Sequence, residues 1–271
     1  MIKVRRRRMS ELSHKIRRAA AVLSPKKNVF LLSHMRAFTS LFGHIMGSNP
    51  EICGYYEMHI GYYSWRSLIR QRLIYFGQED PKPHFNYMFD KVLHNEHEVS
   101  STVLNRPRTK AIFSLRHPRD VIPSILSLYH RVDPTHELNS EAVATEYYIQ
   151  RLANLDKMAA SIQQDFFYLD AETLKSNTDE ALYLLSDWLE LKTRLTPNYQ
   201  IQRNTSRKRF GDSSERLRTG RVMHDGSNYQ NFTLNEDLQN KAADAYEVAR
   251  NHLVQSSAIR CVIQPPRPHG K

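Results

Sequence analysis

The sequence is poor in cysteine and in long apolar runs, and its N-terminal region is poor in acidic residues. Its 271 residues include two cysteines, which excludes a disulfide framework and favours a reducing compartment. The longest apolar runs, such as AAAVL and NVFLL, fall far short of the ~18 residues that a membrane-spanning helix needs. The N-terminus is basic for too long and apolar for too little to resemble a secretory signal, so we expect a cytoplasmic protein.

The positive charge of the chain is concentrated at one end. The formal net charge is +11, and residues 1–27 contain ten Lys and Arg residues against the single acid Glu11. The remaining residues contain 29 basic and 27 acidic side chains, so the body is almost neutral. A nucleic-acid-binding body usually carries its own basic face. We therefore expect the charge to act through the N-terminal arm, residues 1–27, and expect no specific nucleic-acid partner.

Apolar residues recur in this arm at three- and four-residue steps from Ser10 to Leu23, and Pro25 follows. The spacing predicts a basic amphipathic helix that ends before the proline. Such a helix can lie on an anionic membrane, bind an acidic partner or pack on its own domain. The narrow, Ala-rich apolar stripe favours packing on its own domain, and the other two interpretations stay open. At the other end of the chain, residues 265–271 are predicted to be disordered.

Between these ends, residues 28–264 alternate short apolar runs with amphipathic stretches. The alternation predicts one α/β domain in which helices cover both faces of a parallel sheet. The expected strands are 28–33, 110–115 and 165–169, and residues 87–94 are expected to be extended. The expected helices are 64–76, 99–104, 121–130 and 178–191, the last with Thr178 as its N-cap. Residues 203–221 are basic, contain glycine and lack periodicity, so we expect a loop there.

A polar loop follows the first predicted strand. The sequence HMRAFTS places Arg36 in this loop and Thr39 and Ser40 at the start of the next helix, the layout of a phosphate-binding unit. The loop lacks the GxxxxGK[ST] pattern of a nucleotide triphosphatase. Taken alone, the pattern is a weak signal, and it favours an arginine at a surface turn with Thr39 as a helix N-cap.

A second polar loop, LRHPRDVIPS, has the spacing R-x-P-x-D-x-x-x-S. Arg116 ends a predicted strand and Ser124 lies in the following helix, so both can face one anion at the carboxyl edge of the sheet. Asp120 is expected to orient Arg119 or to cap the helix. Two such loops on neighbouring strands predict a ligand with two phosphate-like groups.

With these motifs the sequence resembles the sulfotransferases that use 3′-phosphoadenosine 5′-phosphosulfate (PAPS), and it is nearest to bacterial sulfotransferases and the tyrosylprotein-sulfotransferase branch. HMRAFTSLF resembles the 5′-phosphosulfate loop of the family and LRHPRDVIPSIL its 3′-phosphate motif. Residues 166–191 and 208–221 resemble later parts of the family pattern in the same order. The resemblance implies a P-loop NTPase-like three-layer domain and in-line transfer of a sulfuryl group to an acceptor hydroxyl or amine.

The resemblance also implies roles for individual residues. Arg36 stands at the catalytic Lys/Arg position, and no metal is required. Phe38 replaces the usual glycine, so either the loop is strained by a positive φ or the ring shields the sulfate from water. The implied PAPS contacts are Arg36, Thr39 and Ser40 at the 5′ end, Arg116 and Ser124 at the 3′-phosphate, and further Arg209, Gly211 and Arg221.

The general base has more than one candidate. Glu57 lies 21 residues after Arg36, the interval at which the tyrosylprotein-sulfotransferase branch carries its proposed base. His94 resembles the histidine of the K-x-H motif of cytosolic sulfotransferases, although Lys91 lies three residues before it rather than two. His59 is a further candidate. Glu57 and His94 could also line the acceptor site together.

Two other functions compete with this interpretation. A P-loop nucleotide kinase or phosphotransferase is disfavoured by the missing GK[ST] and by the lack of an evident Mg²⁺-binding aspartate. A non-enzymatic protein that binds an anionic membrane or nucleic acid would act through residues 1–27. The acceptor could be a carbohydrate, lipid, phenol or peptide, and the arm favours an acidic or membrane-associated one. Four tyrosines could form an aromatic wall for the acceptor or belong to the core: Tyr55, Tyr56, Tyr62 and Tyr63.

Overall fold

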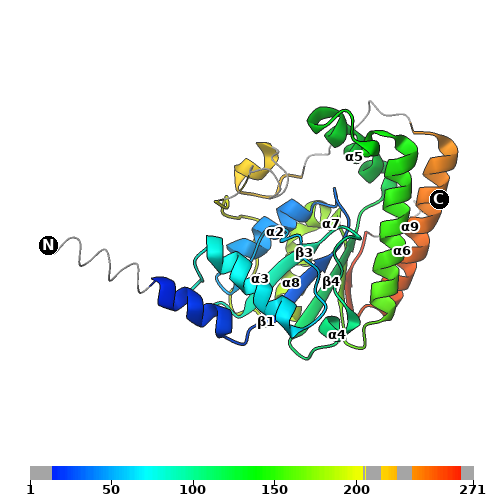
Figure 1. Ribbon diagram of the computed structural model, residues 1–271. Coiled ribbons are helices and arrows are strands. Elements are labelled where there is room, and N and C mark those ends of the chain that lie inside the picture. Colours follow the sequence, from blue (N-terminus) through cyan, green and yellow to red (C-terminus); the bar gives the residue numbers. More distant parts are fainter. Residues whose placement is uncertain (1–13, 204, 206–214, 225–233, 264–271) are drawn as a thin grey trace, which may run out of the picture.

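The computed structural model describes residues 14–203, 205, 215–224 and 234–263. At its centre lies a six-stranded sheet with the strand order β2-β3-β1-β4-β5-β6, and each neighbouring pair is parallel (Figure 1). The strands are β1 Lys27–Leu32, β2 Ile52–Cys53, β3 Tyr87–Val92, β4 Thr109–Leu115, β5 Phe167–Asp170 and β6 Ile259–Cys261.

Helices connect the strands and cover the sheet, and a further helix at residues 14–23 precedes β1. The longer helices are α2 Thr39–Ser48, α3 Trp65–Gln78, α5 Pro118–Val132, α6 Glu141–Ala160, α8 Thr178–Trp188 and α9 Glu236–Ser256. The shorter ones are α4 Ser101–Leu104, α7 Thr173–Ser176 and the 3₁₀ helices Glu137–Asn139 and Glu215–Thr219. Among the described residues, no helix is both long enough and apolar enough to span a membrane.

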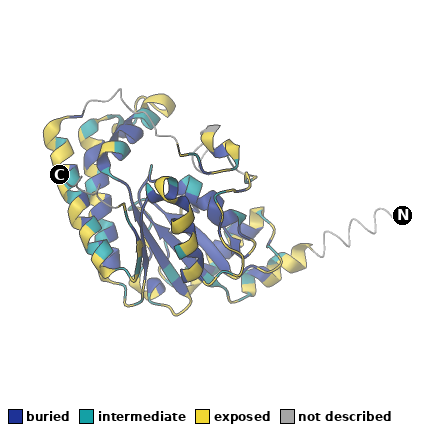
Figure 2. Cartoon of the chain, turned by 180° about the vertical axis from the view of Figure 1, so that it is seen from behind, coloured by how far each residue is buried: buried dark blue, intermediate teal, exposed yellow. Residues whose placement is uncertain are grey.

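The sequence of the central strand β1 is a continuous apolar run because the strand is buried on both faces. Val29 and Leu31 belong to the core cluster that includes residues of α2 and α8. Phe30 and Leu32 belong to the cluster that includes residues of α5, α6 and α9. Because successive side chains of a strand point to opposite faces, both faces of this strand are buried. The predicted three-layer α/β fold is thereby confirmed, and the burial pattern is visible in Figure 2.

The strand order places β1 between β3 and β4. Ligands of open α/β sheets bind at the carboxyl ends of strands where the order reverses. The segments that follow β1, β3 and β4 therefore meet at one edge of the sheet, and these segments carry most of the predicted site residues.

Several elements differ from the sequence prediction. The helix expected at 121–130 begins earlier, at Pro118, since proline suits the first helical position. Thr178 is not an N-cap: Asn177 holds that position, and the Thr178 hydroxyl donates to the Leu174 carbonyl oxygen at 2.8 Å. Helices α6 and α9 were not predicted, because polar residues interrupt their apolar patterns. The loop expected at 203–221 contains the 3₁₀ helix Glu215–Thr219, and the predicted disordered tail lies outside the described residues.

Candidate active site

The loop between β1 and α2 has an irregular backbone. Arg36 and Phe38 have φ values of 65° and 53°, in the left-handed region that non-glycine residues rarely adopt. Phe38 precedes α2 and provides no side-chain cap, and Thr39 is the first residue of the helix rather than its N-cap. Of the two alternatives for Phe38, the strained backbone is the one found. Its ring also has a contact, because the Cζ atom of Arg116 lies 4.1 Å from the ring centre.

The loop between β4 and α5 is shorter and regular. Pro118 begins α5, the His117 side chain accepts a hydrogen bond from the Arg119 backbone N–H, and Asp120 lies in the first turn. Asp120 Oδ2 lies 3.9 Å from Arg119 Nε and 4.0 Å from a guanidinium nitrogen of Arg116. These distances agree with the expected orienting role of the carboxylate.

Hydrogen bonds join the two loops directly. Arg36 Nε donates to Ser124 Oγ at 2.8 Å, and Arg116 Nη1 donates to the Arg36 carbonyl oxygen at 2.9 Å. Arg116 is only 4% exposed, and its Nε has no hydrogen-bond partner among the described residues. A buried guanidinium with an unpaired donor is costly unless an anion or a water satisfies it. The structure thus brings together three residues that the sequence had assigned to two separate motifs.

Residues that the sequence analysis did not identify support these loops. Arg151 of α6 is fully buried and donates from Nε to the Ser33 carbonyl oxygen at 2.9 Å and from Nη2 to that of Val92 at 2.6 Å. Its Nη1 donates to Asn95 Oδ1 at 3.1 Å. This one side chain ties the ends of β1 and β3 together. No sequence signal marked it, because the surrounding helix had not been predicted.

His34 occupies the junction of the two loops. The Arg116 backbone N–H donates to His34 Nε2 at 3.1 Å, so Nδ1 carries the ring proton and donates to the Met35 carbonyl oxygen at 2.9 Å. Burial lowers the pKa of His34 to about 3, with nearby Arg151 and Arg116 adding to the effect. The imidazole is therefore a neutral structural link. Tyr148 supports the same place, because its hydroxyl donates to the Arg116 carbonyl oxygen at 2.7 Å.

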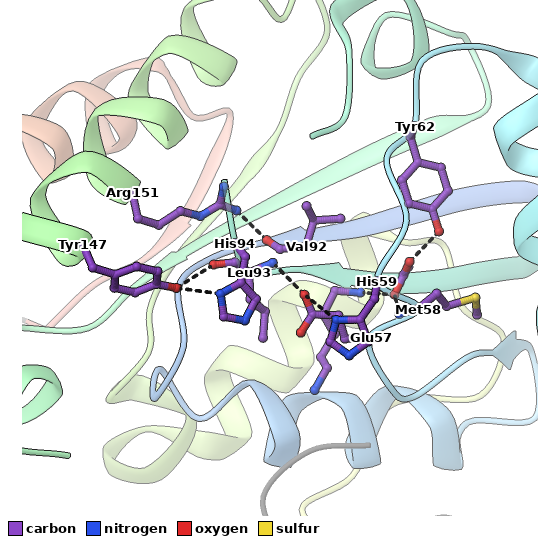
Figure 3. Close-up of polar contacts among 11 residues, drawn as sticks. Glu57, Met58, His59, Tyr62, Val92, Leu93, His94, Tyr147 and Arg151 are labelled. Atoms are coloured by element: carbon purple, nitrogen blue, oxygen red, sulfur yellow. Dashed lines mark hydrogen bonds and ion pairs between the residues drawn. The ribbon is translucent and has the colours of Figure 1, made fainter. Parts of the chain in front are cut away.

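Both candidates for the general base lie beside the end of β3 (Figure 3). Glu57 is 8% exposed, and its Oε1 accepts a hydrogen bond from the Leu93 backbone N–H at 3.3 Å. His94 follows directly and pairs through Nδ1 with the Tyr147 hydroxyl at 2.9 Å. Burial lowers the pKa of His94, and the nearby Glu57 carboxylate opposes that shift. The third candidate, His59, has Nδ1 at 4.0 Å from Glu57 Oε1.

A buried aspartate holds the segment that carries Glu57. Asp90 of β3 accepts hydrogen bonds from the backbone N–H groups of Met58 at 3.1 Å and Lys91 at 2.8 Å, and a short one from the Tyr62 hydroxyl. Complete burial raises the pKa of Asp90 to about 8, and the Tyr62 bond opposes this. The sequence analysis did not identify Asp90, although an aspartate inside the largely apolar run YMFDKV could have signalled this role.

Close packing fixes the same segment against α2. A Cβ atom at Gly43 would lie 2.2 Å from the Tyr55 carbonyl oxygen, so no side chain fits at this helix position. Of the four tyrosines proposed as an acceptor wall, Tyr55, Tyr56 and Tyr62 are buried in the core and Tyr63 is 58% exposed. The structure therefore favours the core interpretation for three of them.

The remaining predicted ligands are less closely placed. Thr39 is buried and Ser40 is half-buried in the first turn of α2. Arg221 is exposed and pairs through an isolated bridge with Asn198, while residues 209 and 211 lie outside the described part of the chain. Within the described residues, no group of three or more His, Cys, Asp and Glu side chains could hold a metal ion.

The chain forms a P-loop NTPase-like α/β domain. At the carboxyl ends of its strands, two neighbouring loops bring their arginines together. No family model and no curated protein matches the chain. Among solved structures it is similar to the sulfotransferase domain from the curacin biosynthetic pathway, with 15% sequence identity and a TM-score of 0.51. The match covers 87% of this chain and 99% of that domain. At this identity the likeness shows the fold alone.

Proposed function

We propose that this protein is a sulfotransferase that moves the sulfuryl group of PAPS to an acceptor hydroxyl or amine. The observation that carries the proposal is the link between Arg36, Ser124 and Arg116 at the carboxyl edge of the sheet. The likeness of the fold to a sulfotransferase domain supports the same reaction class. Glu57 and His94 lie beside the end of the neighbouring strand and can handle the acceptor's proton.

The residues present fit a nucleotide with two anionic ends. The buried Arg116 has an unpaired Nε, and Ser124 is 1% exposed with its hydroxyl already held by Arg36. Arg116 and Ser124 would hold the 3′-phosphate, and Arg36, Thr39 and Ser40 would face the 5′ end. The bound nucleotide supplies the sulfuryl group and a phosphate leaving group. Arg36 stabilises the negative charge that grows on the transferred group and on the leaving oxygen.

The acceptor's proton goes to Glu57 or His94 as the acceptor oxygen or nitrogen bonds to sulfur. Because burial lowers the pKa of His94, its imidazole is neutral at physiological pH and able to accept a proton. The Tyr147 hydroxyl donates to the Leu93 carbonyl oxygen at 3.4 Å, so its oxygen can accept from a protonated Nδ1, and in that tautomer Nε2 is free to accept the proton. Glu57 is held by the Leu93 backbone N–H, so it is oriented for the same task or for stabilising a protonated His94.

Nucleotide binding tests the first half of the proposal. Calorimetry should show that adenosine 3′,5′-bisphosphate binds more tightly than AMP or ATP with Mg²⁺. Arg116→Ala should weaken this binding at least tenfold, about 1.4 kcal/mol. Arg119→Ala is the matched control, because that arginine is 75% exposed in the first turn of α5, and this variant should bind the bisphosphate normally. Tighter binding of ATP with Mg²⁺, or indifference to Arg116→Ala, would point to a phosphotransferase instead.

Measurements of turnover test the second half of the proposal, the transfer of the sulfuryl group to an acceptor. Radiolabelled PAPS offered to a panel of phenols, sugars, lipids and peptides should identify the acceptor class. With an active acceptor, Glu57→Gln and His94→Gln are compared. The variant that removes the base should lose at least ~100-fold in kcat while bisphosphate affinity stays unchanged. If both variants keep normal kcat, neither residue is the base.

A further inference from the structure

A pocket open to solvent lies at the opposite edge of the sheet, where β1 and β4 begin. It has a volume of about 210 Å³ and is lined by the end of helix 14–23, one side of α3 and the segment before β4. Its lining contains four cationic side chains and no carboxylate: Lys26, Arg72, Arg106 and Arg108. None of the four takes part in the ion pairs found among the described residues.

Two of the lining side chains are deeply buried and incompletely paired. Arg72 is 7% exposed and Thr109 is 4% exposed, and Arg72 Nε and Thr109 Oγ1 have no hydrogen-bond partner among the described residues. Arg72 Nη1 donates to the carbonyl oxygens of Val22 at 3.2 Å and Ser24 at 2.7 Å. The guanidinium thus anchors the end of helix 14–23 beside the pocket. Unpaired buried donors and uncompensated positive charge favour an anionic ligand.

Helix 14–23 packs on the domain through Ala21 and Val22 at its end and through polar contacts of Arg17 and Arg18. Arg18 Nε lies 2.9 Å from Asp80 Oδ1, Arg17 donates to the Pro81 carbonyl oxygen at 3.4 Å, and only Ala21 of this helix is buried. The apolar stripe predicted from the sequence faces away from the body, since Ile16 is 60% exposed and Leu23 is 77% exposed. The helix therefore does not use its stripe to pack on its own domain (Figure 2).

A large aromatic side chain continues this exposed apolar surface. Trp65, the first residue of α3, lines the pocket together with Leu23 and is 52% exposed. An exposed tryptophan next to leucine and arginine is typical of the membrane interface, where the indole ring lies at the level of the headgroups. A nucleic acid would match the cations but not the apolar stripe.

We propose that helix 14–23 and this pocket, the amino-edge pocket, form a docking surface for an anionic membrane. A lipid phosphate or carboxylate group binds among Lys26, Arg72, Arg106 and Arg108, while Leu23 and Trp65 enter the interfacial layer. The surplus of nine positive charges in residues 1–27 provides the electrostatic attraction. Because the surface lies at the edge opposite Arg36 and Arg116, this inference is independent of the proposed function.

The two tryptophans of the chain allow a direct test. Trp188 belongs to the core and is 9% exposed, so a change in indole emission on membrane contact reports on Trp65. The full-length protein is mixed with vesicles of phosphatidylcholine alone or vesicles that also contain phosphatidylserine. We expect flotation with the anionic vesicles and a blue shift of the emission. The variant Trp65→Phe should lose the blue shift.

Matched variants separate this surface from general positive charge. Arg106→Gln with Arg108→Gln should reduce partitioning onto anionic vesicles at least ~10-fold. Removing two exposed cations elsewhere, with Arg131→Gln and Lys241→Gln, should have a much smaller effect. Leu23→Gln should weaken binding, whereas Val248→Gln, at a position 69% exposed on α9, should not. All variants should retain the wild-type melting temperature and affinity for adenosine 3′,5′-bisphosphate.

Three results would overturn the proposal. The first is equal partitioning onto neutral and anionic vesicles, or onto neither. The second is wild-type partitioning by the Arg106→Gln, Arg108→Gln variant. The third is a Trp65 blue shift with glycerol phosphate or polyglutamate as large as with vesicles, which would assign the surface to a small anion or to an acidic protein.

Discussion

The two loops that form the candidate active site reach the same place by different means. The β4–α5 loop is specified locally, with Pro118 at the start of the helix, the His117 side chain on a backbone N–H and Asp120 in the first turn. The β1–α2 loop has two left-handed residues, Arg36 and Phe38, and no side-chain cap on its helix. Its shape depends on contacts from elsewhere in the chain.

Those contacts come from two segments, helix α6 and the β4–α5 loop. Arg151 of α6 holds the carbonyl oxygen of Ser33, the Arg116 side chain holds that of Arg36, and His34 accepts from the Arg116 backbone. A strained conformation persists only when the surrounding structure determines it strongly. The comparison teaches that the first loop is a product of tertiary structure and the second is a product of its own sequence.

The largest expected effect is that of removing the remote support of the first loop. Arg151→Met keeps the volume but leaves the carbonyl oxygens of Ser33 and Val92 without their donor, and we expect a loss of about 3–5 kcal/mol in the free energy of unfolding. Urea denaturation measures it. Lys157→Met, at an exposed position of the same helix, is the control and should change stability by less than about 0.5 kcal/mol. A loss in the free energy of unfolding below about 1 kcal/mol for Arg151→Met would show that the first loop does not depend on this distant support.

The second effect is a pH dependence of stability due to His34. Its pKa is about 3 in the folded protein, against the usual value near 6.5 in the unfolded chain. Between these values the unfolded chain binds the extra proton, so stability falls as the pH is lowered from about 6.5, by up to about 1.4 kcal/mol per pH unit.

The variant His34→Gln lacks this proton-binding group. It should be less stable than the wild type at pH 7, but its free energy of unfolding should fall less steeply toward pH 4. Chemical denaturation at a series of pH values gives both curves. Parallel curves for the two proteins would show that His34 is not neutral in the folded state.

The smallest effect concerns backbone strain at Phe38. Phe38→Ala and Phe38→Gly both remove the ring. Alanine is destabilised by about 1–2 kcal/mol because it still has to adopt the left-handed conformation. Glycine avoids that cost but loses about 0.4–1 kcal/mol of stability because its unfolded chain is more flexible. The glycine variant should therefore be more stable by about 0.5–1 kcal/mol in thermal or urea unfolding.

The same pair of substitutions at Asp120, in the first turn of α5, provides the contrast. There the backbone is helical, so alanine should be more stable than glycine, by up to about 1 kcal/mol. If the same residue, alanine or glycine, gave the more stable variant at both Phe38 and Asp120, the proposed difference between the two loops would be contradicted.

Much of the fold could be predicted because its signals are local. The apolar runs at β1 and β4 and the residues after them were enough to place Arg36 and Arg116 at one edge of a parallel sheet, whereas His94 was found only through its resemblance to a family motif. Helix α6 escaped prediction because it buries Arg151, a residue type that normally marks a solvent-facing side. Its contact with Ser33 spans 118 positions in the sequence, and no periodicity can report such a distance.

For the general base, the sequence predicted the candidate residues but not their positions relative to one another. Spacing alone offered Glu57 and His94 as competitors, whereas the structure places both beside the end of β3, with Glu57 on the Leu93 backbone N–H. Asp90 and Gly43 bring this about, by anchoring the segment to β3 and by letting α2 approach it closely. The two candidates are therefore neighbours in one site.

The sequence by itself determined the alternation of strands and helices, the two loop motifs and the concentration of charge at the N-terminus, since each depends on residues close together in the chain. Tertiary structure alone decided that Arg36 bonds to Ser124, that Arg151 supports the first loop and that the apolar stripe of helix 14–23 faces away from the domain. Hydrogen bonds and burial depend on which distant segments pack together, and that is settled only when the sheet assembles.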